Sequence, residues 1–63
     1  MDERGIRLGQ LLKLAGLAGS GSDATALLAT GEVTVNGESE ARRGRQLHPG
    51  DVVRAGPHAV RIT

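Results

Sequence analysis

Three arginines lie close together in the second half of the chain, and their type and spacing suit them to bind phosphate. Arg42, Arg43 and Arg45 fall within the stretch 41–48, which contains no acidic residue. A guanidinium group presents a planar fork of N–H donors that matches the oxygens of a phosphate group. The cluster therefore indicates contact with phosphate groups, although a solvated loop of charged side chains would have the same composition.

A second candidate anion site lies at Ser20 and Gly21, within the sequence Gly-Ser-Gly-Ser that precedes a helical pattern. Exposed backbone N–H groups at the start of a helix attract anions. The segment lacks the following Lys-Ser/Thr and the preceding strand of a nucleotide-binding P-loop, so that type of site is not expected. Plain capping of the helix by Ser20 explains the same residues equally well.

Catalytic and metal-binding patterns are not found. His48 and His58 both lie in turns that contain proline and glycine, with no patterned nucleophile or acid beside them. The chain has no cysteine, and its histidines and acids show no ligand spacing. A chain of 63 residues also buries too little surface to enclose a deep substrate cavity. We expect a protein that is not an enzyme and that has no metal, cofactor or small-molecule substrate.

The composition narrows the class of partner. The net charge is only +1, 38% of the residues are hydrophobic, and no apolar run approaches the roughly 20 residues that span a membrane. With no signal peptide at the N-terminus, we expect a soluble cytoplasmic protein. Phe, Trp and Tyr are absent, which argues against a reader of unpaired bases, because such proteins stack bases on aromatic rings. Recognition of phosphates in a structured or double-stranded nucleic acid remains.

The elements that must position these residues are predicted from hydrophobic periodicity. Residues 1–5 are polar and are expected to form a flexible N-terminus, and 6–63 to form a single domain. A first helix is predicted from residue 6 to Gly16, and a second from about residue 21 to Thr30. The inward positions of the two helices are Leu8, Leu11, Leu12 and Ala15, then Ala24, Leu27 and Leu28.

After residue 31 the period changes from 3.6 to 2, which indicates strands. The pattern predicts strands at 33–35, 52–55 and 59–63, and Asn36-Gly37 predicts a tight turn after the first of them. Helices followed by short antiparallel strands predict an α+β domain. For the polar stretch 38–46, a strand, a bulge and an open loop all remain possible.

Five segments of the chain, taken together and in order, resemble the S4 domain. They are Leu-Gly-Gln-Leu-Leu-Lys from residue 8, Ser-Gly at 20, Gly-Glu-Val-Thr-Val-Asn-Gly from 31, Arg-Arg-Gly-Arg from 42, and Gly-Asp-Val-Val from 50. The resemblance covers about residues 6–62. Within that family the chain is most similar to the small standalone bacterial RNA-binding proteins of the YbcJ type.

The resemblance implies an αL RNA-binding motif, in which two helices pack on a small antiparallel sheet and a basic face binds structured RNA. It suggests ribosomal or transfer RNA as the target and a larger ribonucleoprotein as a further partner. By position, it assigns RNA contact to Lys13, Ser20, Gly21, Arg42, Arg43 and Arg45. It places Val52 in the core, together with the periodic leucines and valines. The chain departs from the family's pattern at Gly9, Gly21, Thr25 and Gln46, where charged residues are common.

Two other functions fit parts of the pattern. A protein-interaction module could dock the basic loop on an acidic partner. A β-grasp sulfur carrier shares the Val-Asn-Gly-Glu and Gly-Asp-x-Val segments, but it needs a C-terminal Gly-Gly, and this chain ends in Ile62-Thr63.

Overall fold

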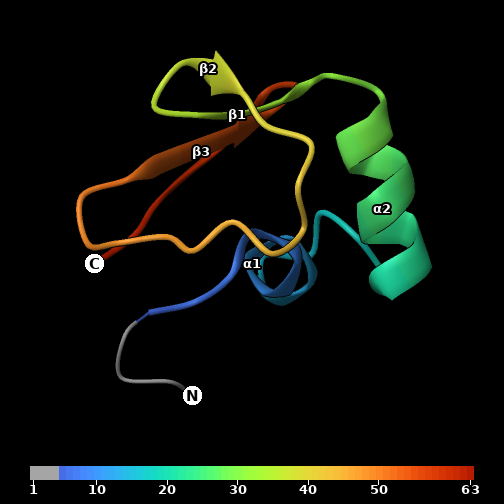
Figure 1. Ribbon diagram of the computed structural model, residues 1–63, viewed down its shortest axis with the longest axis horizontal. Coiled ribbons are helices and arrows are strands. Elements are labelled where there is room, and N and C mark those ends of the chain that lie inside the picture. The colour runs from blue at the N-terminus through green and yellow to red at the C-terminus, as the bar shows by residue number, and fades with distance from the viewer. Residues whose placement is uncertain (1–4) are drawn as a thin grey trace.

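Two short helices precede a four-stranded antiparallel sheet along the chain (Figure 1). The structure is a computed structural model and describes residues 5–63. Its elements are α1 (Leu8–Leu14), α2 (Gly21–Ala29), β1 (Val33–Val35), β2 (Glu38–Ser39), β3 (Val52–Ala55) and β4 (His58–Arg61). The strands lie in the order β2-β1-β3-β4, so the predicted α+β class is confirmed. The segment 1–5, predicted to be flexible, lies outside the described residues except for Gly5.

Helix α1 begins two residues later than predicted, because the chain before it is held in an extended conformation. The Leu47 N–H donates to the Ile6 carbonyl at 2.8 Å, and the Leu8 N–H donates to the Arg45 carbonyl at 2.8 Å. A β-carbon on Gly5 would collide with the carbonyl oxygen of Leu47, so the two segments are in close contact. The pattern of residues 6–8 gave no indication of this pairing, because its partner lies about forty residues away.

Gly16 terminates helix α1 as predicted, but Ala15 is not on the buried face as expected. Gly16 adopts a φ of +77°, and the Leu17 N–H returns to the Leu12 carbonyl at 2.9 Å. This is the hydrogen bond of a Schellman motif, which favours glycine at its left-handed position. Ala15, expected on the buried face, forms the C-cap and is exposed, since the helix ends before its next inward turn.

The register of the sheet decides which valines are buried. Asn36 and Gly37 both have positive φ, which confirms the predicted tight turn between β1 and β2. Val35 pairs with Val53 across β1 and β3, and Val33 pairs with Ala55. Since alternate residues face opposite sides of a sheet, Val53 is fully buried and Val52 is only half-buried. The assignment of Val52 to the core is therefore wrong by one residue.

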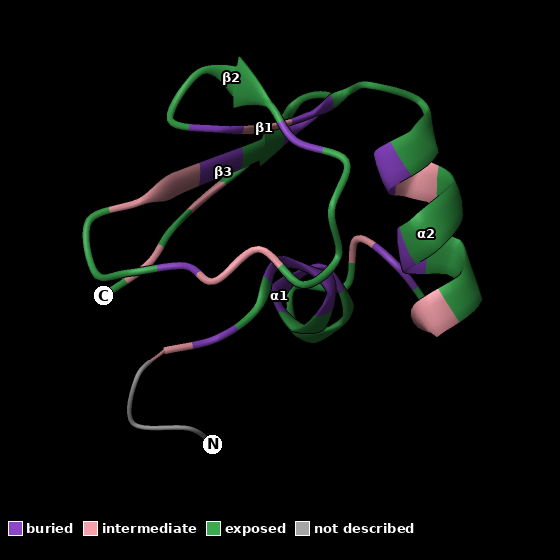
Figure 2. Ribbon diagram, in the orientation of Figure 1, coloured by how far each residue is buried: buried purple, intermediate pink, exposed green. Residues whose placement is uncertain are grey.

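The core lies between the two helices and one face of the sheet (Figure 2). Its fully buried large side chains are Leu8, Leu12, Leu28, Val33, Val35, Leu47 and Val53. Leu47 belongs to the long connection between β2 and β3, which descends from the sheet and passes across α1 (Figure 1). This connection carries the three arginines, and the burial of Leu47 anchors it. Within residues 5–63, no helix has the length and apolar character needed to cross a bilayer.

Candidate nucleic-acid interface

A groove of about 350 Å³ opens where the first turns of α1 and α2 meet the connection from β2 to β3. Its charged and polar lining comes from Arg7, Gln10, Lys13 and Arg43, and its small lining residues include Gly9 and Gly21. None of the described residues that line it is acidic. We call it the cationic groove. Three of the lining side chains are cations, so its charge favours phosphate.

Arg43 reaches across the beginnings of both helices. Its carbonyl accepts a hydrogen bond from the Gly9 N–H at 2.9 Å, which fixes its backbone against α1. Its Nη1 donates to the hydroxyl of Thr25 on α2 at 3.4 Å. A β-carbon on Gly9 would lie 3.4 Å from the Arg43 Cβ, and one on Gly21 would lie 3.6 Å from its Nη2. Both distances are ordinary van der Waals contacts, so the Arg43 side chain packs closely against the backbone at the start of each helix.

Arg7 is a groove residue that the sequence did not reveal. Its Nη1 donates to the carbonyl of Gly44 at 2.8 Å, which ties the residue before α1 to the residue after Arg43. The side chain reaches the groove only because residues 6–8 pair with 45–47. No local pattern around Arg7 predicts that pairing.

Lys13 lies in the last turn of α1, exposed, and lines the same groove. No hydrogen bond or ion pair of its ammonium group is found among residues 5–63. The structure thus brings Lys13, Gly21 and Arg43 together, three of the six residues that the resemblance assigned to RNA contact.

Ser20 caps α2. Its hydroxyl oxygen accepts a hydrogen bond from the Asp23 N–H at 3.2 Å, and Asp23 places an acidic side chain in the first turn. Both features stabilise the start of a helix. Ser20 is not among the residues that line the cationic groove. Its observed contact is the capping contact, the simpler of the two explanations that the sequence allowed.

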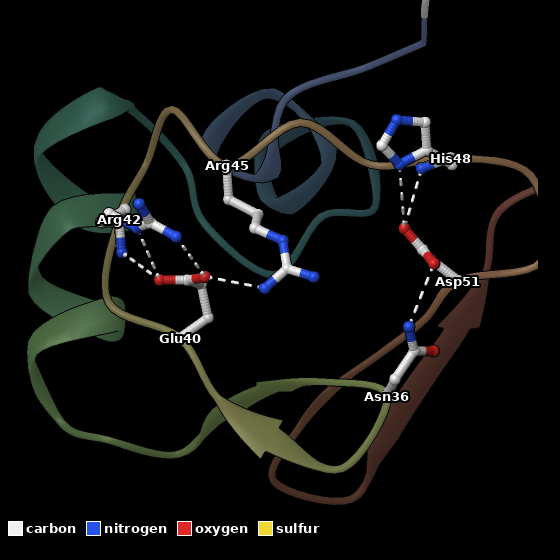
Figure 3. Close-up of polar contacts among 6 residues, drawn as sticks. All are labelled: Asn36, Glu40, Arg42, Arg45, His48 and Asp51. Carbon is white, nitrogen blue, oxygen red and sulfur yellow. Dashed lines mark hydrogen bonds and ion pairs between the residues drawn. The ribbon is translucent and has the colours of Figure 1, made fainter.

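Arg42 and Arg45 contact a carboxylate instead of the groove (Figure 3). Arg42 Nε lies 3.2 Å from one oxygen of Glu40, and Arg45 Nη1 lies 2.9 Å from the other. Glu40 is the buried charged residue of the described chain, with 9% of its surface exposed. The three arginines therefore separate into two groups, Arg42 and Arg45 around Glu40, and Arg43 in the groove.

The hydrogen bonds from Arg42, and then that from Arg45, lower the pKa of Glu40 from 4.5 to about 2. Because the folded protein favours the ionised form, Glu40 stabilises the fold fully above about pH 4.5 and loses this contribution as the pH falls toward 2. We expect the free energy of unfolding, measured in urea, to fall across this interval. The fall should be smaller in Glu40→Gln. Glu38→Gln, a change at an exposed glutamate of β2, serves as the control, and an equally reduced fall in both variants would contradict the assignment.

A second polar cluster fixes the other end of the connection (Figure 3). Asn36 Nδ2 donates to Asp51 Oδ1 at 3.0 Å, its Oδ1 accepts from the Val52 N–H at 2.9 Å, and the His48 N–H donates to Asp51 Oδ2 at 2.8 Å. The bonds from Asn36 and from the His48 backbone lower the pKa of Asp51. These contacts hold the turn before β3 against the turn after β1. Across residues 5–63, no three His, Cys, Asp or Glu side chains gather as metal ligands would.

Comparisons with known proteins point to one family. The model of the S4 domain family matches residues 1–63. A relative from Bacillus subtilis, named "Probable ribosome maturation protein RlbA", is 51% identical over 53 residues, which cover 84% of this chain and 75% of the relative. No solved structure matches the chain significantly. The match over the whole chain, together with the helices, the sheet and the basic connection, shows that the chain belongs to the S4 domain family.

Proposed function

We propose that the protein is a non-enzymatic RNA-binding module that contacts the phosphate backbone of structured RNA through the cationic groove. The observation that carries the proposal is the convergence of Arg7, Lys13 and Arg43 on one groove without an acidic lining residue. Phosphate contacts of this kind supply affinity and position the protein without reading the base sequence. Gly21 contributes the start of α2, where the helix dipole favours an anion.

The remaining residues assigned by the resemblance have supporting roles in this proposal. Ser20 caps the helix that begins at the groove, and Arg42 and Arg45 add positive charge beside it. The absence of aromatic side chains favours a double-stranded or folded RNA over an unpaired strand.

The relative's name supports ribosomal RNA as the target. That protein is described as a probable ribosome maturation protein, and a small module without catalytic residues could serve there by binding ribosomal RNA within a larger ribonucleoprotein. Residence in the cytoplasm is part of the same proposal. A transfer RNA is the alternative structured RNA, and an acidic protein is the alternative partner.

The test is a fluorescence anisotropy titration of a labelled RNA hairpin at several salt concentrations. We expect Lys13→Ala/Arg43→Ala to lower the affinity at least about tenfold. Its plot of log K against log salt should be shallower by about 1.4 to 1.8 units, because two phosphate contacts are removed. A fragment of ribosomal RNA and a transfer RNA serve as further probes of the target.

Arg54→Ala/Arg61→Ala is the matched control, because it removes the same charge from exposed positions on β3 and β4 that do not line the groove. Circular dichroism confirms that both variants fold. If the control loses as much affinity as the groove variant, only the net charge matters and the proposed site is wrong. If the wild type binds no RNA even at low salt, the proposal fails and a protein partner is favoured.

A further inference from the structure

Glu40 lies in the connection from β2 to β3, and its carboxylate contacts two of the three arginines there. It follows β2 directly, and its N–H donates to the Val33 carbonyl at 3.0 Å, so its backbone is fixed by the sheet. The side chain is 10% exposed and accepts hydrogen bonds through both oxygens. Its buried position next to two cations is an unusual arrangement for a loop whose expected task is to contact an anion.

The contacts around Glu40 join residues on both sides of Arg43. The carboxylate accepts from the Arg42 N–H at 3.2 Å, from Arg42 Nε at 3.2 Å and Nη2 at 3.4 Å, and from Arg45 Nη1 at 2.9 Å. These bonds bend the chain around the carboxylate (Figure 3). Arg43 lies between Arg42 and Arg45 in the sequence. Its carbonyl accepts a hydrogen bond from the Gly9 N–H, and its side chain is directed to α1 and α2.

The three arginines differ in the free energy that binding an RNA phosphate would cost, because they differ in the contacts that each would have to give up. If Arg42 or Arg45 turned fully to a phosphate, a carboxylate that is largely shielded from water would lose one of its two charged donors, which costs free energy. Arg43 has no carboxylate partner among the residues that the structure describes; its side-chain hydrogen bond is to a hydroxyl at 3.4 Å. A phosphate can therefore bind Arg43 without breaking an ion pair.

We propose that Glu40 is a positioning residue for RNA binding, which holds Arg42 and Arg45 so that Arg43 alone of the three arginines is directed to an RNA phosphate. This inference rests on the proposed function and assigns different tasks to arginines that the sequence presents as equivalent. Arg42 and Arg45 contribute a positive potential near the groove, while Arg43 makes the contact.

The first experiment compares Arg42→Gln, Arg43→Gln and Arg45→Gln in the RNA hairpin titration. Glutamine keeps an N–H donor for Glu40 and removes the charge, so the fold is preserved better than with alanine. We expect Arg43→Gln to reduce the salt slope by about 0.7 to 0.9 units, which corresponds to one phosphate contact. Arg42→Gln and Arg45→Gln should reduce the slope clearly less than Arg43→Gln, because they remove charge beside the groove and no phosphate contact. An equal reduction in all three variants would overturn the inference.

The second experiment tests whether Glu40 acts through Arg43, with a double-mutant cycle of Glu40→Gln and Arg43→Gln. We expect Glu40→Gln to weaken RNA binding several-fold in the wild-type background and to have no effect when Arg43 is already changed. A similar change in both backgrounds would show that Glu40 does not act through Arg43, and tighter binding would show that its charge only repels RNA. Either result would overturn the inference. Circular dichroism and thermal unfolding confirm that each variant is folded at the temperature of the titration.

The two proposals fail in different ways. If neither Lys13→Ala/Arg43→Ala nor any single arginine variant alters the salt slope, the cationic groove is not the RNA site. Suppose instead that the groove variant reduces the salt slope while Arg42→Gln and Arg45→Gln reduce it as much as Arg43→Gln does. In that case the cationic groove is still the RNA site, and only the proposed role of Glu40 is wrong.

Discussion

Leu47→Ala is expected to reduce the free energy of unfolding by about 2 to 5 kcal/mol, because it removes a fully buried side chain and leaves a cavity. At about 0.05 to 0.15 kcal/mol per residue, a domain of 63 residues has only about 3 to 9 kcal/mol in total. The variant should therefore be largely unfolded at moderate urea concentrations. Urea denaturation followed by circular dichroism measures this effect.

Leu14→Ala is the matched control for Leu47→Ala. The substitution is chemically identical, but the Leu14 side chain is 71% exposed at the end of α1. We expect its effect to be within about 0.5 kcal/mol. Similar losses in the two variants would mean that the connection from β2 to β3 is not anchored in the core at Leu47.

The second large effect is expected at Asn36, whose side chain holds the turn before β3 and whose φ is +54°. Alanine would lose the hydrogen bonds to Asp51 and Val52 and would be strained in the left-handed region. The combined cost is about 2 to 4 kcal/mol. Asn36→Gly should cost only about 1 to 2 kcal/mol, because glycine accepts the backbone conformation and loses only the bonds.

The comparison of Asn36→Ala with Asn36→Gly separates the two contributions in the same urea experiment. A glycine variant as unstable as the alanine variant would mean that the hydrogen bonds account for the whole effect. Asn36 was interpreted from the sequence as a turn residue, and its contacts to Asp51 and Val52 extend that role across the sheet.

Local patterns predicted most of the fold. The leucine spacing identified both helices, and the glycines after them marked where each helix ends. The alternation of valines identified β1, and Asn-Gly identified its turn. These features depend on neighbouring residues, so the sequence contains the information directly. Two adjacent valines, 52 and 53, could not be assigned to faces in this way, because their alternation is decided by the pairing of β3 with β1.

The candidate site was less accessible to sequence analysis. The arginine cluster was recognised, but its division between a carboxylate and a groove depends on the fold. Glu40 stands just outside the stretch without acidic residues, so its contacts with Arg42 and Arg45 were missed. Arg7 was missed because it reaches the groove through a long-range pairing. The placement of Arg43 depends on its contacts with Gly9 and Thr25, which are distant in the sequence and are not shown by a pattern of residue types.

The joining of residues 5–9 to 43–47 limits when the cationic groove can form during synthesis. Helices α1 and α2 have 7 and 9 residues, too few to be stable alone in water. The groove is lined by residues of α1, α2 and the connection that follows β2. A nascent chain that ends before Arg43 therefore cannot form the groove. Isolated peptides that carry either helix should therefore be poor competitors for RNA. On the proposed function, RNA binding becomes possible only after most of the domain has been translated and has folded as a unit.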